Sequence, residues 1–328
     1  MGARAAGPFD LPGVTAYVAE VLREPSAIIG CVLPAPLAGG AVAGWPRLLP
    51  GLFGIRSAVR VYLEEQGGRT RSAALVYEPS RPEWLVLVLV ADPTPAGADG
   101  AFRLLSAICA AGARRGMHRV FGSVPDEVRA RETFFQAGFY SYTRETWYVS
   151  TGTGLERPAR DGGAKVARSG DAHDLFRFYL ATTPHAVQRA EQLSVHDFDV
   201  GQAAGAFEAP HLVGGNPMAM RRASTFIDRD DDRPRAMAVG FRGLERHPHV
   251  LKVRTDGPDI DRARELLRMV ARDLPPDRPL AAPVRSYEDH VARALLAEGS
   301  KEMATAMLFV KELAQRIEEP ALAPAVVR

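Results

Sequence analysis

Each half of the chain closes with the same kind of segment, and this repetition limits the possible folds more than any other feature of the sequence. A glycine begins a strand-like run that reaches a valine eleven residues later, in residues 138–149 and again in 299–310. The apolar pairs Phe134-Phe135 and Leu295-Leu296 stand at the same offset before the two glycines. Because several elements agree in order and spacing, the sequence predicts a duplicated domain.

The length of the chain fits two domains. Its 328 residues exceed the usual size of one hydrophobic core. Between the halves, "TGTGLERPARDGG" is rich in Gly, Pro and charge and has no apolar periodicity, which is typical of a linker. We therefore predict an N-terminal domain over residues 1–150, a linker over 151–163, and a C-terminal domain with a tail over 164–328.

The first half has an α/β pattern. Alternating apolar residues in 56–65 and 69–77, around Gly67-Gly68, predict a β-hairpin. The run "EWLVLVLVAD", residues 83–92, is apolar on both faces and predicts a central strand. Further helices and strands follow in alternation as far as residue 149. Each half should therefore form a mixed, mostly antiparallel sheet flanked by helices, in an α/β fold with two tandem domains.

The second half repeats this order. A helix is expected after Asp171, which would be its N-cap, and another is expected to begin at Pro184. Strands are expected at 224–228, 235–242, 249–254, 280–284 and 302–311, and helices at 260–273 and 287–298.

One apolar segment of the first half does not fit the pattern. Residues 28–55 are apolar, yet four prolines and several glycines interrupt them. We interpret this segment as an ordered loop that covers a core, with a ligand lid as the alternative.

The composition excludes several classes of protein. The net charge of +2 on 41 basic and 39 acidic residues gives no overall field that would attract nucleic acid or a membrane surface. Cys31 and Cys109, the two cysteines of the chain, are too few for a disulfide framework and should be buried. No histidine spacing indicates a metal site. The start of the sequence has no secretory core, so a cytoplasmic location is expected.

These elements resemble the GNAT superfamily of acyl-CoA-dependent N-acyltransferases, over about residues 10–150. The stretches that carry the resemblance are "LVLVLVADPTPAGADGAFRLL" and "EVRARETFFQAGF". The resemblance implies acetyl-CoA or another acyl-CoA as cofactor, and transfer of an acetyl-type group to the amine of a small molecule or peptide. In the second half the resemblance is weaker and covers about residues 164–311.

The resemblance also implies cofactor-binding residues. The cofactor-binding residues would be Phe134 and, in the family's phosphate loop, Val90, Asp92, Gly97, Gly100 and Ala101. Glycines there let backbone N–H groups approach a diphosphate at a helix N-terminus. Asp99 falls on the family's first loop glycine and would be a helix cap that places a carboxylate near the phosphates.

The closing helix of the first half departs from the family at one position. Phe134 stands where many members have the tyrosine that protonates the leaving thiolate, and phenylalanine has no proton to give. In the second half this position is Leu295, and Asp256, Asp259 and Asp261 surround the helix start, where they disfavour a diphosphate. The first half is therefore the better candidate for acyl-CoA.

Three residues are candidates for acid–base catalysis. Glu83 precedes the central strand, Glu127 follows the next strand, and Tyr140 lies beside the Gly-Phe turn, where it would replace the missing acid. The alternative for the two glutamates is a solvated carboxylate at a strand end or helix start, and for Tyr140 it is packing.

Residues 182–199 are more polar than a core helix and would form either one wall of an acceptor pocket or an exposed helix pair. Two functions remain open: an N-acyltransferase, and a catalytically inactive tandem protein that binds a ligand or another protein. The sequence does not indicate the oligomeric state.

Overall fold

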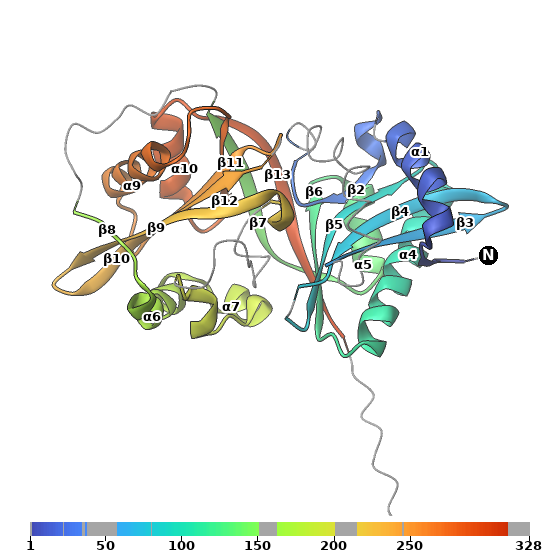
Figure 1. Cartoon of the computed structure of the whole chain (residues 1–328), viewed down its shortest axis with the longest axis horizontal. Coiled ribbons are helices and arrows are strands. Elements are labelled where there is room, and N and C mark those ends of the chain that lie inside the picture. Colours follow the sequence, from blue (N-terminus) through green and yellow to red (C-terminus); the bar gives the residue numbers. More distant parts are fainter. Residues whose placement is uncertain are drawn as a thin grey trace, which may run out of the picture.

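One continuous sheet runs through the whole molecule in the computed structural model (Figure 1). The structure describes residues 2–21, 23–34, 37, 58–79, 81–150, 163–200, 215–244 and 246–313. Within these residues the sheet has thirteen strands in the order β1-β3-β4-β5-β6-β13-β7-β12-β11-β10-β9-β8, and β2 pairs with β5 beside this path. The linker predicted at 151–163 lies outside the described residues except for Gly163, so the proposed domain limits stay a prediction.

The N-terminal half contains the predicted hairpin, central strand and helices. Its strands are β1 (Arg4–Ala5), β2 (Ile28–Cys31), β3 (Val59–Gln66), β4 (Arg69–Tyr77), β5 (Glu83–Ala91), β6 (Arg119–Pro125) and β7 (Tyr140–Ser150). Its helices are α1 (Leu11–Val21), α4 (Pro95–Arg114) and α5 (Val128–Gln136). Residues of α1 pack in the hydrophobic cluster on one face of the sheet, and α4 and α5 pack in the cluster on the other.

The C-terminal half repeats this plan. Its strands are β8 (Lys165–Val166), β9 (Met220–Asp230), β10 (Arg233–Gly243), β11 (His249–Thr255), β12 (Leu280–Arg285) and β13 (Lys301–Glu312). Its helices are α6 (Ala172–Thr182), α7 (His185–Glu191), α9 (Ile260–Asp273) and α10 (Asp289–Ala297), and the 3₁₀ helix η5 (Val195–Phe198) follows α7. Figure 1 shows α9 and α10 over one face of this half of the sheet and α6 and α7 over the other.

The two repeated closing segments, β7 and β13, exchange places. β13 pairs with β6 of the N-terminal half, and β7 pairs with β12 of the C-terminal half. The two strands also pair with each other, with Tyr140 opposite Val310 and Val149 opposite Lys301. Equivalent positions of the repeat thus pair reciprocally. Each half needs the last strand of the other to complete its sheet.

The segment from residue 28 begins with a strand, so the interpretation of residues 28–55 as a loop is wrong at its start. β2 runs antiparallel to the end of β5, with Ile28 opposite Val90 and Cys31 opposite Val88. The Val32 N–H donates to the Leu87 carbonyl at 3.0 Å. Except for Leu37, residues 35–57 lie outside the described residues, so a lid there is not tested.

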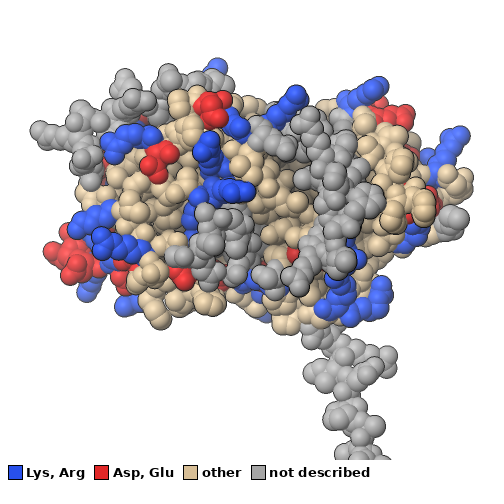
Figure 2. Space-filling view, viewed as in Figure 1, with Lys and Arg blue, Asp and Glu red and all other residues tan. Residues whose placement is uncertain are grey.

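Two other expectations can be compared with the structure. Cys31 and Cys109 are both buried and unbridged, as predicted. Among the described residues, no helix is both long enough and apolar enough to cross a bilayer. Figure 2 shows basic and acidic side chains mixed over one face of the molecule, in line with the balanced charge of the sequence.

Candidate functional site

In the N-terminal half, the gap between β5 and β6 beside the predicted phosphate loop is filled by another strand. β5 and β6 pair in parallel only from Glu83 to Val86, and then diverge. β2 fills the resulting gap: Val90 is opposite Ile28 of β2 on one side and Ala73 of β4 on the other. A Cβ on Gly30 would lie 3.4 Å from the Ser123 carbonyl of β6. The backbone edge of β5 that a bound ligand would need is therefore already hydrogen-bonded.

The predicted phosphate loop is occupied by contacts within the protein. Thr94 is the N-cap of α4, and its hydroxyl accepts from the Gly97 N–H at 3.2 Å. Pro95, the first residue of the helix, has no N–H to offer. The guanidinium of Arg129 donates to the Asp92 carbonyl. The prediction of Asp99 as the cap is wrong, because this residue is exposed in the second turn of α4.

The remaining predicted cofactor residues have packing roles. A Cβ on Gly97 would lie only 2.1 Å from the Asp92 carbonyl oxygen, and one on Gly100 would lie 2.9 Å from a Glu64 carboxylate oxygen. Asp92 itself forms an ion pair with Arg71 at 3.0 Å. Ala101 and Phe134 are fully buried in the core between α4, α5 and the sheet. These glycines let α4 approach the sheet closely.

Glu83, the first catalytic candidate, is a buried member of an ion-pair network. Its carboxylate lies 2.6 Å from Arg119 and 3.4 Å from Arg81. Burial raises the pKa of Glu83, and both arginines oppose this shift. Arg119 also donates to the Ala190 carbonyl of α7 at 2.9 Å. Glu83 therefore connects the N-terminal strands to the helical cover of the C-terminal half.

The other two catalytic candidates do not join Glu83 in one constellation. Glu127 is exposed at the start of α5, beyond the opposite end of β6 from Arg119. The hydroxyl of Tyr140 lies 3.2 Å from Glu312 at the end of β13, and burial raises its pKa. The sequence therefore identified three polar residues that the fold keeps in separate surroundings.

The C-terminal half has the equivalent divergence between strands, and here a pocket lies against it. β11 and β12 pair in parallel only at His249 with Leu280 and Val250 with Ala281. Beyond these pairs the strands separate, and both of them contribute to the walls of an open pocket. We call it the C-terminal pocket. Its lining residues are Leu175, Tyr179, Asp197, Phe198, Val200, Arg222, Thr225, Met237, Val239, Phe241, Lys252, Val253, Arg254, Pro283 and Glu288.

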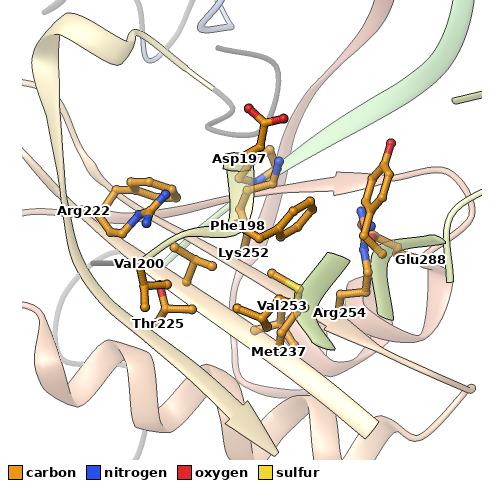
Figure 3. A pocket seen from close by; sticks show the side chains of 15 residues that line it. Asp197, Phe198, Val200, Arg222, Thr225, Met237, Lys252, Val253, Arg254 and Glu288 are labelled. Carbon is orange, nitrogen blue, oxygen red and sulfur yellow. The ribbon is translucent and has the colours of Figure 1, made fainter. Parts of the chain in front are cut away.

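The apolar wall of the C-terminal pocket follows from strand alternation. Met237, Val239 and Phe241 alternate along β10 and face the pocket, while Ala236 and Ala238 pack toward α9. Leu175 and Tyr179 come from α6, and Phe198 from η5. Figure 3 shows Phe198 and Met237 between the charged side chains of the pocket.

Three charged residues of the pocket lining form ion pairs. Arg254 lies 2.8 Å from Glu288, donates to the Thr183 hydroxyl at 2.6 Å, and stacks over the ring of Tyr179. Asp197 forms a close ion pair with Arg81 of the N-terminal half. One wall of the pocket is thus fixed to the other half of the molecule.

Lys252 lies beside Arg254 on the same face of β11. Burial lowers the pKa of Lys252 to about 8, and Arg285 adds to this effect, whereas Glu145 and Glu288 oppose it. Arg285 in turn forms ion pairs with Glu145 of β7 at 2.9 Å and with Glu191 of α7 at 3.4 Å. Lys252 of the pocket lining is therefore close to an ion-pair network that joins the exchanged strand β7 to β12 and α7.

The helix that follows β11 has no room for a diphosphate at its N-terminus. Asp259 is the N-cap of α9 and accepts from the Arg262 N–H at 2.9 Å. Asp256 forms an ion pair with Arg235 at 2.7 Å, and Asp261 is exposed in the first turn. Asp259 and Asp261 stabilise this helix start.

Comparisons with known proteins identify the fold. Over 96% of this chain and 99% of the other, the structure superposes with a TM-score of 0.55 and 10% identity on a tandem GNAT protein from the clavulanic acid biosynthesis pathway. A GCN5-related N-acetyltransferase from Sphaerobacter thermophilus gives a TM-score of 0.55 at 12% identity over 97% of both chains. No protein-family model matches the chain, and no curated protein sequence is significantly similar to it. The predicted fold, two tandem GNAT-like α/β halves, is confirmed.

Proposed function

We propose that this protein binds a small organic molecule in the C-terminal pocket, and that the N-terminal half serves as a scaffold for that site. The observation that carries the proposal is the difference between the two strand divergences. In the N-terminal half β2 pairs with β5 and closes the gap. In the C-terminal half the gap adjoins an open pocket with an apolar wall and a few charged groups, which is the usual composition of a ligand site.

The contacts between the halves support the scaffold role. Arg81 holds Asp197 in the pocket wall, and Arg119 holds the Ala190 carbonyl of α7. Both arginines also bind Glu83 at the start of β5. Because a buried charge without its partner is costly, these pairs fix α7 and η5 over the pocket.

An acyl-CoA-dependent N-acyltransferase, with an amine acceptor in this pocket, is the second candidate. Two observations favour it. The strands β11 and β12 diverge next to the pocket, and one solved structure with a similar fold is named as an N-acetyltransferase. The described residues do not fit the cofactor's diphosphate, however, because Thr94 with Pro95 and Asp259 occupy the two helix starts. We therefore assign no residue a role in acyl transfer.

A neutral fluorescent probe, N-phenyl-1-naphthylamine, tests the proposal. Its emission should rise when it enters the C-terminal pocket, and Val239→Trp, which fills the pocket, should abolish the rise. Met303→Trp, at a partly exposed position of β13, is the matched control and should bind like the wild type. Equal binding by the Val239 variant would show that the probe binds elsewhere and would refute the proposal.

Acetyl-CoA separates the two candidates. A ligand that binds only the native state must raise the midpoint of thermal unfolding. If millimolar acetyl-CoA and free coenzyme A leave the midpoint unchanged while the neutral probe binds, the acyltransferase candidate falls and the binding function stands. A shift with acetyl-CoA that Val239→Trp removes would favour the acyltransferase instead.

A further inference from the structure

We propose that the ligand of the C-terminal pocket carries one carboxylate and that Arg222 binds it. This inference rests on the proposed function, because it takes the pocket as the ligand site and adds the chemical class of the ligand. It depends on the backbone that directs Arg222 into the pocket, on the charges around it, and on the apolar wall next to it.

A strand irregularity directs Arg222 into the pocket. Ser224 on β9 is opposite Gly240 on β10, but the next pair along the ladder joins Arg222 with Phe241. Ala223 is thus an extra residue in β9, as in a β-bulge. Phe241 faces the pocket, and residues that pair across a ladder share a face, so the bulge moves Arg222 to the pocket side. Arg221, its neighbour, stays exposed.

The carboxylates that line the pocket already have arginine partners. Asp197 is paired with Arg81, and Glu288 is paired with Arg254 at 2.8 Å. A ligand amine would have to compete with a guanidinium for either carboxylate. The described lining residues therefore favour a ligand whose own charge is negative.

Arg222 differs from the other arginine of the pocket in its partners. Its guanidinium donates to the backbone carbonyl of Asp199 at 3.2 Å, and within the described ranges it forms no ion pair. Burial lowers its pKa, and the carboxylate of Asp199 opposes this shift from a greater distance than an ion pair. A half-buried guanidinium with a carbonyl as its hydrogen-bond acceptor gains from an anion, and its planar donors suit a carboxylate.

The apolar wall defines the rest of the ligand. Figure 3 shows Arg222 with Val200 at one end of the pocket and Arg254 with Glu288 at the other. Phe198 and Met237 lie between these ends. A ligand that reaches from Arg222 along this wall buries an apolar body. Arg222 supplies a planar guanidinium at this end, whose paired donors match a carboxylate, and Lys252 adds a further positive group to the lining.

Matched acids and amides test the inference. The probes are 3-phenylpropionate and hexanoate, each with its neutral amide, titrated into the full chain by calorimetry. We expect each acid to bind at least tenfold more tightly than its amide. Arg222→Gln should weaken the acids at least tenfold and leave the amides unchanged, whereas Arg221→Gln, the exposed neighbour, should change neither.

The outcomes distinguish this inference from the proposed function. Equal binding of acid and amide by the wild type overturns the carboxylate assignment without any variant. Undiminished acid binding by Arg222→Gln overturns the role of Arg222, provided that this variant still binds N-phenyl-1-naphthylamine and so keeps an intact pocket. If the neutral probe binds the wild type but no acid does, the carboxylate inference alone fails. If the neutral probe does not bind either, the proposed function fails with it.

Discussion

Gly30 of β2 lies directly against the ring of Phe134 of α5: a Cβ on this glycine would come within 3.3 Å of the ring's Cζ atom. The same ring covers Gly122 of β6, where a Cβ would lie 2.6 Å from it. Phe134 therefore packs across the gap between β5 and β6 together with the strand that fills it. Phe134, at the position where the sequence resemblance implies a tyrosine, is thus part of the core that closes this gap.

Phe134→Tyr should destabilise the protein and should not restore acyl-CoA binding. The new hydroxyl would extend from Cζ toward Gly30 in a fully buried site, at a cost of about 1–3 kcal/mol for the crowding and the desolvated group. Urea unfolding measures the loss, with calorimetry against acetyl-CoA beside it. A variant as stable as the wild type would show that this region is less closely packed than the structure indicates.

Gly97→Ala and Gly13→Ala should have opposite effects, although both change a glycine in a helix. At Gly97 the new methyl group would collide with the Asp92 carbonyl oxygen, whereas at Gly13 of α1 nothing lies within 4 Å. We expect Gly97→Ala to destabilise by about 1–3 kcal/mol. Gly13→Ala should stabilise by up to about 1 kcal/mol. Thermal unfolding measures the change in stability of each variant. Equal changes in the two variants would contradict the packing role of Gly97.

The same loop shows what the sequence could and could not predict. The apolar run of β5 located the strand correctly, but α4 begins at Pro95, before the glycines that the sequence placed at the helix start. The sequence pattern alone does not distinguish a glycine that admits a phosphate from one that admits the chain's own carbonyl, as Gly97 does. The strand β2 was missed because its four residues precede a stretch rich in proline and glycine.

Phe309→Ala should loosen the N-terminal half, although residue 309 belongs to the last strand of the chain. Its ring contacts Phe134 and Phe135 with centroids 5.5 and 5.0 Å away, and β13 pairs with β6. Truncating a fully buried phenylalanine costs about 3–5 kcal/mol. Hydrogen exchange should quicken in residues 119–125 of β6, whereas Met303→Ala, at a partly exposed position of the same strand, should leave them unchanged. Faster exchange confined to the C-terminal half would argue against the strand exchange.

His247 should make the protein sensitive to mild acid. It is buried beside the Pro248 carbonyl at 2.8 Å, and burial lowers its pKa to about 4. The unfolded chain binds a proton near pH 6.5 but the folded protein does so only near pH 4, so stability falls as the pH falls through this window. The loss should reach about 3 kcal/mol relative to His247→Gln. Parallel stability curves of the two proteins from pH 7 to 4 would refute the assignment.

The C-terminal pocket was only partly visible in the sequence. The polar segment at 182–199 is expected from the sequence to form either one wall of an acceptor pocket or an exposed helix pair, and Asp197 and Phe198 of that segment line the C-terminal pocket. Lys252 and Arg254 gave a further signal that was not used, since two cations alternate within an otherwise apolar strand. Arg222 could not be assigned to this face, because its orientation depends on a bulge that no residue pattern marks.

Hydrogen exchange with and without N-phenyl-1-naphthylamine tests the central claim, that the ligand site lies in the C-terminal half, most directly. Binding should slow exchange in α6 and β11, residues 172–182 and 249–255, which line the C-terminal pocket. Exchange in β2 and β5, residues 28–31 and 83–91, should stay unchanged, because these strands already pair with each other. If the probe slows exchange in β2 and β5 but does not slow it in β11, the account is contradicted and the ligand site lies in the N-terminal half.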